Sequence, residues 1–221
     1  LAVSSILIAI LFGILFGVLT ALNQGTIFDK SVLFISALGM SLPSFFSSII
    51  VAWLFAYLLA DYTGFSMTGS LYEVDDYGRG EYLSLKNLIL PSFTLGIGAA
   101  AGYLRITRSA MLEVLDSEYV KLARAKGVSN NAVIWKHAFK NALIPPLTIA
   151  PLLMVSFITG VIVTESIFAW PGLGRIGVDA IGNNDFPVLT ATVLFFAIIF
   201  AVVNFLTDIA YAFIDPRIRY S

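Results

Sequence analysis

Long uncharged runs constrain this sequence more than any other feature. Five stretches contain no Asp, Glu, Lys or Arg: residues 1–22, 31–60, 87–104, 141–164 and 186–207. A helix needs about 20 apolar residues to cross the hydrocarbon core of a bilayer. Backbone amides and carbonyls must be paired inside hydrocarbon, so each run is predicted to cross as a helix. The sequence therefore predicts an all-α integral membrane protein, a polytopic bundle of about five transmembrane helices.

The overall composition agrees with a membrane environment. Hydrophobic residues make up 58% of the chain and charged residues 12%, whereas soluble domains are about half apolar and a quarter charged. A net charge of −1 gives no reason to expect nucleic acid as a partner. The chain has no cysteine and a single histidine, His137, which leaves little material for a metal site.

The basic residues are distributed unevenly between the two sides that the five runs define. One side carries ten of them: Lys30, Arg105, Arg108, Lys121, Arg124, Lys126, Lys136, Lys140, Arg217 and Arg219. The other side carries three: Arg79, Lys86 and Arg175. The positive-inside rule then places residues 105–140 and the C-terminus in the cytoplasm, and residues 61–86 and 165–185 outside. Leu1 would lie outside, so we expect a further helix before it in the full-length protein.

The basic loop after the third run has helical periodicity. Its apolar residues recur at steps of three or four, which predicts an amphipathic helix: Leu112, Leu115, Tyr119, Leu122 and Ala123. Gly127 is expected to adopt a left-handed conformation at the helix end, and Ser129 to begin a second helix through residues 133–139. On these residues alone, the hairpin could equally rest on lipid headgroups.

Two strings in this loop carry a resemblance. Residues 119–127 read Tyr-Val-Lys-Leu-Ala-Arg-Ala-Lys-Gly and residues 137–145 read His-Ala-Phe-Lys-Asn-Ala-Leu-Ile-Pro. They resemble the cytoplasmic signature loop of ABC importer permeases, in its dipeptide/oligopeptide version. The general pattern has Glu-Ala-Ala where Lys121, Leu122 and Ala123 stand here, and its proline comes earlier than Pro145. The resemblance implies that a coupling loop over about 105–145 docks an ATPase subunit through nine candidate residues: Tyr119, Ala123, Arg124, Ala125, Lys126, Gly127, His137, Asn141 and Pro145.

Two further segments are similar to the same family. Residues 165–175, Glu-Ser-Ile-Phe-Ala-Trp-Pro-Gly-Leu-Gly-Arg, resemble its outer loop, and residues 214–220 resemble its C-terminal end. The candidate outer-loop residues are Glu165, Trp170, Pro171, Gly172 and Gly174. Leu173, Ile176, Ala180 and Ile181 share a helical face, so this loop lies against the membrane, gates the pathway or simply packs. Glu165 and Asp208 are either pathway ligands or proton-relay groups, or residues at helix ends that anchor at the interface, where water or headgroups reach them, or simply pack.

The resemblance implies one permease domain over residues 1–221, in the bacterial inner membrane. Expected partners are a second permease subunit in a heterodimer, cytoplasmic ATP-binding subunits, an extracytoplasmic binding protein and lipid. Peptides are the default substrate, with nickel chelates, glutathione and oligosaccharides as alternatives. The acidic segment 61–86 either meets the binding protein or is a solvated loop.

No phosphate-binding loop of the form Gly-x-x-x-x-Gly-Lys-Ser/Thr occurs in the sequence, so ATP is expected on partner subunits and no cofactor in this chain. An integral-membrane enzyme would need a buried catalytic constellation, and an ion-coupled carrier intramembrane ionisable groups or inverted repeats. Neither pattern is present in the sequence, which favours a transport subunit without enzymatic activity.

Overall fold

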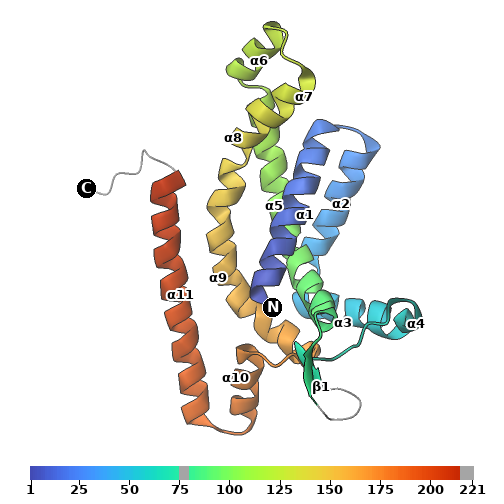
Figure 1. The fold of residues 1–221 in the computed structure, drawn as a ribbon, viewed down its shortest axis with the longest axis vertical. Coiled ribbons are helices and arrows are strands. Elements are labelled where there is room, and N and C mark those ends of the chain that lie inside the picture. Colours follow the sequence, from blue (N-terminus) through green and yellow to red (C-terminus); the bar gives the residue numbers. More distant parts are fainter. Residues whose placement is uncertain (75–79, 215–221) are drawn as a thin grey trace.

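A computed structural model describes residues 1–74 and 80–214 and is helical along most of its length (Figure 1). The elements follow in the order α1 (Ala2–Leu22), α2 (Ile27–Ser41), α3 (Ser44–Trp53), the π-helical η1 (Leu54–Leu58), α4 (Ala60–Thr63), β1 (Tyr72–Val74), β2 (Glu81–Leu83), α5 (Lys86–Leu115), α6 (Glu118–Ala125), α7 (Asn130–Ala132), the π-helical η2 (Val133–Phe139), α8 (Lys140–Ala142), α9 (Ile144–Ile167), α10 (Leu173–Gly182) and α11 (Phe186–Ile214).

The predicted membrane-spanning helices are largely present. Among the described residues, α1, α5 and the 186–206 part of α11 are long and apolar enough to cross a membrane, and α2 with the following α3–η1 makes a fourth, bent candidate. Helix α9 has 24 residues, about 36 Å at 1.5 Å per residue, which also suffices to cross. The all-α membrane bundle is confirmed, with one short hairpin added.

The run 31–60, predicted to cross as one helix, is broken into two in the structure. It bends by 109° between α2 and α3. Leu42 has an extended backbone, φ −82° and ψ 130°, and Pro43 follows it. A proline has no N–H to donate and disfavours the helical conformation of the residue before it, which explains the break.

Helix α5 is longer than its uncharged run. It continues past residue 104 through Arg105 and Arg108 to Leu115, because arginine ends an apolar run without opposing the helix. A break at Asp116 and Ser117 then separates α5 from α6. The single amphipathic helix predicted from Leu112 to Ala123 is therefore wrong, since these residues belong to two helices.

Helices α1 and α5 form the centre of the bundle and run side by side (Figure 1). Gly13 and Gly17 of α1, one turn apart, face Tyr103 and Thr107 of α5. A Cβ on Gly13 would overlap that of Tyr103, and one on Gly17 would lie 2.6 Å from that of Thr107. Small residues four apart let two backbones approach closely, and such contact is the main source of helix association in lipid.

The two ends of the molecule carry different structures (Figure 1). The α1–α2 connection and the α6–α7 segment lie at one end, and α10 with the β1–β2 hairpin at the other. The predicted grouping of Lys30 and Arg108 with residues 118–140 therefore matches one end of the fold. Arg79, Arg217 and Arg219 lie outside the described residues, as do Asp75, Asp76 and the 215–220 part of the C-terminal resemblance.

The acidic segment before α5 is folded. Strands β1 and β2 pair antiparallel, with Tyr72 opposite Leu83. The Glu73 carboxylate accepts hydrogen bonds from Asn87 Nδ2 at 2.6 Å and from the Tyr82 hydroxyl at 2.8 Å. These bonds, that of Asn87 first, lower the pKa of Glu73. The hairpin is thus tied to the first turn of α5.

Candidate functional site

The protruding segment of residues 116–142, called the elbow below, turns at Gly127. Gly127 has φ +77°, the left-handed conformation that the sequence predicts. Its N–H donates to the carbonyl of Arg124 at 3.0 Å, and the Val128 N–H donates to that of Ala123 at 3.2 Å. This pair of bonds is the Schellman arrangement that satisfies the last carbonyls of a helix. Ser129 occupies the cap position of α7, as predicted, but its side chain makes no capping bond.

A small apolar core holds the two arms of the elbow together. Val120 and Ala123 of α6 and Val133 of η2 are buried in one cluster, and Val128 packs against it. Ala123, a candidate docking residue, therefore faces inward. The arms are fixed relative to each other by packing as well as by the turn.

Three other candidate residues meet in a polar contact, the Tyr119–Asn141 clasp. The Asn141 Nδ2 donates to the Tyr119 hydroxyl oxygen at 2.7 Å and to the His137 carbonyl at 3.2 Å. The Tyr119 hydroxyl donates to the same carbonyl at 3.4 Å. His137 takes part through its backbone and not its imidazole. The clasp joins α6 to η2 and α8 across 22 residues.

The remaining elbow candidates are exposed. Arg124, Ala125 and Lys126 lie on the surface, and the elbow also exposes large apolar side chains such as Trp135, which is 54% exposed. Pro145 is exposed in the first turn of α9 and lies outside the elbow. Cations beside exposed aromatic and aliphatic groups can bind a protein groove or lipid headgroups, so both sequence interpretations are compatible with this surface.

The outer turn, residues 165–175, is built around the Glu165 carboxylate. Its Oε2 accepts hydrogen bonds from the backbone N–H groups of Gly174 at 2.9 Å and Arg175 at 3.2 Å. Glu165 thus caps α10 from a different helix, satisfying free N–H groups of its first turn. Glu165 lies near the end of α9, as expected, but it is only 5% exposed and packs against the start of α10 instead of facing water. The side chain of Asp208 is not among those that the structure describes.

The glycines of the outer turn leave room for that carboxylate. A Cβ on Gly172 would overlap the Glu165 carboxylate, and one on Gly174 would lie 2.6 Å from the Cα of Ile162. Trp170 is buried, and its backbone N–H donates to the Glu165 carbonyl at 2.8 Å. Pro171 is exposed. Four of the five predicted residues therefore build one compact corner between α9 and α10.

The apolar face identified in the sequence coincides only in part with the face of α10 that packs within this chain. Gly174, Gly177 and Ala180 are buried, whereas Leu173, Ile176 and Ile181 are exposed. Small residues allow α10 to approach α9 and α11 closely, which explains why they, and not the larger apolar residues, face inward.

One buried polar contact between two helices was not predicted from the sequence. Asp29, at the start of α2, forms a bidentate ion pair with Arg108 of α5. The local signal was the capping pattern Thr26-x-x-Asp29, whose Thr26 hydroxyl accepts from the Asp29 N–H at 3.3 Å. That pattern predicts a helix start but not a partner 79 residues away.

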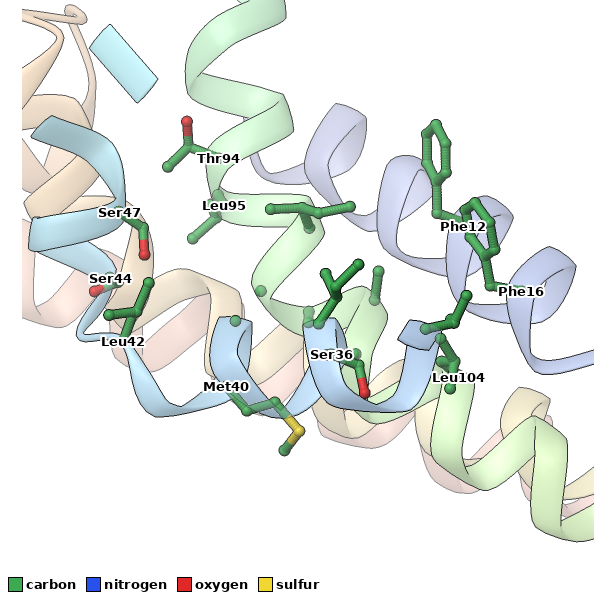
Figure 2. A pocket seen from close by; sticks show the side chains of 18 residues that line it. Phe12, Phe16, Ser36, Met40, Leu42, Ser44, Ser47, Thr94, Leu95 and Leu104 are labelled. Atoms are coloured by element: carbon green, nitrogen blue, oxygen red, sulfur yellow. The ribbon is translucent and has the colours of Figure 1, made fainter. Parts of the chain in front are cut away.

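A cavity of about 550 Å³ lies between α1, α2, α3 and α5. Figure 2 shows Phe12 and Phe16, Ser36 and Met40, Ser44 and Ser47, and Thr94, Leu95 and Leu104 around it. The described residues that line it carry no charge.

Comparison with known proteins identifies the family. Residues 13–220 match the family model described as "Binding-protein-dependent transport system inner membrane component". The chain belongs to this family. It is therefore a transmembrane permease subunit of an ABC importer, which works with ATPase subunits and a binding protein, and the family is one of transport components and not of enzymes.

Similar proteins of known name support the assignment of this chain to a family of permeases. The chain is 39% identical to the dipeptide transport system permease protein DppB of Alkalihalophilus pseudofirmus, over 100% of this chain and 70% of the relative. Identity is also 39% to a di/tripeptide permease of Pseudomonas aeruginosa (91% of this chain, 64% of the relative) and to the oligopeptide permease AppB of Bacillus subtilis (98% and 67%). The chain thus spans about two thirds of their lengths.

A solved structure supports the fold of the permease. An inward-facing MetNI methionine ABC transporter matches with a TM-score of 0.70 and 17% identity, covering 97% of this chain and 91% of that chain. At this identity the match concerns the fold alone.

Proposed function

We propose that this permease imports short peptides and that its elbow docks a cytoplasmic ATPase subunit. The observation that carries the docking assignment is the construction of the elbow. A glycine turn, an apolar core and the Tyr119–Asn141 clasp hold two short arms rigidly beyond the bundle, with Arg124 and Lys126 exposed. A rigid protrusion transmits displacement to the helices that carry it. Peptide substrates are supported by the names of the relatives, and nickel chelates, glutathione and oligosaccharides are the alternatives.

The proposed mechanism is alternating access. Closure of the ATPase subunits on ATP displaces the docked elbow, and the bundle changes from inward-open to outward-open, where a binding protein delivers substrate. The nine coupling-loop residues and the five outer-loop residues predicted from the sequence mark the proposed docking and gate regions. Among the nine, Ala123 packs inside the elbow and Pro145 lies beyond it at the start of α9. This chain supplies no cofactor site, since ATP is bound by its partners.

The proposed assembly is a heterodimer with a second permease subunit, in which residues 1–221 act as one permease domain. Residues 105–140 and the C-terminus face the cytoplasm, and residues 165–185 face outside. Ten basic residues on the elbow side against three on the other support this orientation.

Two substitutions at Gly127 test the docking assignment. Its ideal Cβ would meet no atom within 4 Å, so a substitution acts through the positive φ alone. Valine there is strained by about 1–2 kcal/mol, whereas asparagine tolerates the left-handed region. We expect Gly127→Val to lower dipeptide uptake and ATPase co-purification at matched membrane abundance, and Gly127→Asn to retain both. Normal uptake and co-purification for Gly127→Val would refute the assignment.

A further inference from the structure

The ion pair between Asp29 and Arg108 is the best-formed charged contact between separate helices in the described part of the chain. Arg108 Nε donates to Asp29 Oδ1 at 2.9 Å and Nη2 donates to Oδ2 at 2.8 Å, while the Gly25 N–H donates to Oδ2 at 2.9 Å. Asp29 is 2% exposed. Burying charges is expensive and adds little net stability, even when the geometry is good. Net stabilisation of the fold alone therefore does not account for this ion pair.

Arg108 lies on the helix that leads into the elbow and packs against it. It lies seven residues before the end of α5, about two helical turns. Beyond it, Ala110 and Met111 pack in one buried cluster with Ala138 and Ala142 from the second arm of the elbow. Any displacement of the elbow is thus transmitted by close packing to the part of α5 that carries Arg108.

Asp29 anchors a helix that has little other attachment. Of the 15 residues of α2, all of them described, only Asp29 and Ser36 are buried. Much of the remaining apolar surface of α2, such as Phe34 and Leu38, is exposed. Since few α2 side chains are buried within this chain, the bidentate ion pair is its best-formed polar contact with α5.

Helix α2 leads from this anchor to the apolar cavity. Ser36, Gly39 and Met40 line that cavity, opposite Phe12 and Phe16 of α1 (Figure 2). The path runs from the elbow through α5 and the ion pair to α2, and it ends at the wall of the cavity that α2 contributes.

We infer that the Asp29–Arg108 ion pair is a coupling strut, which makes α2 follow the elbow and so transmits the ATPase movement to the cavity. Both are positioning residues: neither contacts substrate or nucleotide in this assignment. The inference rests on the proposed function, because it takes the elbow as the docking element.

The central test uses Asp29→Asn, which keeps the shape of the side chain and removes its charge. The matched control is Asp179→Asn, which makes the same change in the exposed ion pair of Asp179 with Arg175 at 3.8 Å. The assembled transporter is reconstituted in vesicles with its ATPase subunits, its binding protein and a labelled dipeptide. We expect Asp29→Asn to retain the ATPase subunits but to import about tenfold less dipeptide per ATP hydrolysed, within the usual range of coupling between sites. The control should match the wild type.

A distance measurement separates coupling from folding. The chain has no cysteine, so spin labels on cysteines at Asn130 in the elbow and Phe34 on α2 are unique in it. With cysteine-free partners, we expect the same label distance with and without ATP in the wild type and an ATP-dependent change in Asp29→Asn. Arg108→Lys, which keeps the charge but loses the bidentate contact, should give an intermediate change.

The outcomes distinguish the two proposals. A wild-type chain that does not retain ATPase subunits would refute the proposed function and the strut with it. Wild-type coupling in Asp29→Asn would overturn the strut alone. Loss of ATPase subunits from both Asp29→Asn and Arg108→Lys would also overturn it, since the pair would then only build the elbow.

Discussion

The elbow and the outer turn both join two helices through glycine, but they need glycine for different reasons. At Gly127 the surroundings are empty and only the positive φ, +77°, excludes most side chains. At Gly172, φ is −130°, an ordinary extended value, and the obstacle is the Glu165 carboxylate. One turn therefore depends on a backbone dihedral angle and the other on volume. The same sequence feature can thus reflect a local or a tertiary constraint.

Alanine at the two glycines should separate these constraints most clearly. We expect Gly172→Ala to destabilise the protein by about 3 kcal/mol, at the upper end for overpacking, because its methyl group must displace a buried carboxylate. Gly127→Ala should cost about 1 kcal/mol, from φ alone. Thermal unfolding of the two variants in detergent would measure the difference. Equal destabilisation would show that the two turns do not differ in this way.

Removing the charge of Glu165 should have the next largest effect. Hydrogen bonds to charged groups contribute about 1.5–3 kcal/mol, and Glu165→Gln weakens two of them at the start of α10. We expect lower thermal stability and faster proteolysis between α9 and α10. Glu118→Gln, in the exposed pair of Glu118 with Lys121, is the control and should change stability little. A stable Glu165→Gln would mean that packing alone holds the outer turn.

The smallest effect is expected at the elbow clasp. Tyr119→Phe removes the hydroxyl that accepts from Asn141, a neutral hydrogen bond of about 1 kcal/mol at an exposed site. Global stability should be nearly unchanged, while the affinity for the ATPase subunit should fall a few-fold, as titration of detergent-solubilised subunits would show. A loss of stability as large as that of Glu165→Gln would contradict the contrast between an exposed clasp and a buried cap.

Features that depend on neighbouring residues could be predicted from the sequence. The helical runs follow from uncharged length, and the position of Gly127 follows from the end of a periodic helix, because both are properties of a short stretch of chain. The resemblance of residues 119–127 and 165–175 also led to the correct family. The break at Pro43 is equally local, because proline lacks the N–H of a helix and restricts the residue before it.

Tertiary structure alone decided which distant residues meet. Asp29 and Arg108 are 79 residues apart, and Tyr119 and Asn141 are 22 apart; a side chain's own neighbours in sequence do not specify such partners. The buried face of α10 consists of Gly174, Gly177 and Ala180 because α9 and α11 approach it closely. Periodicity identifies an apolar face of a helix, but in lipid an apolar face need not be a buried one, since close backbone approach and not hydrophobicity selects the packed side.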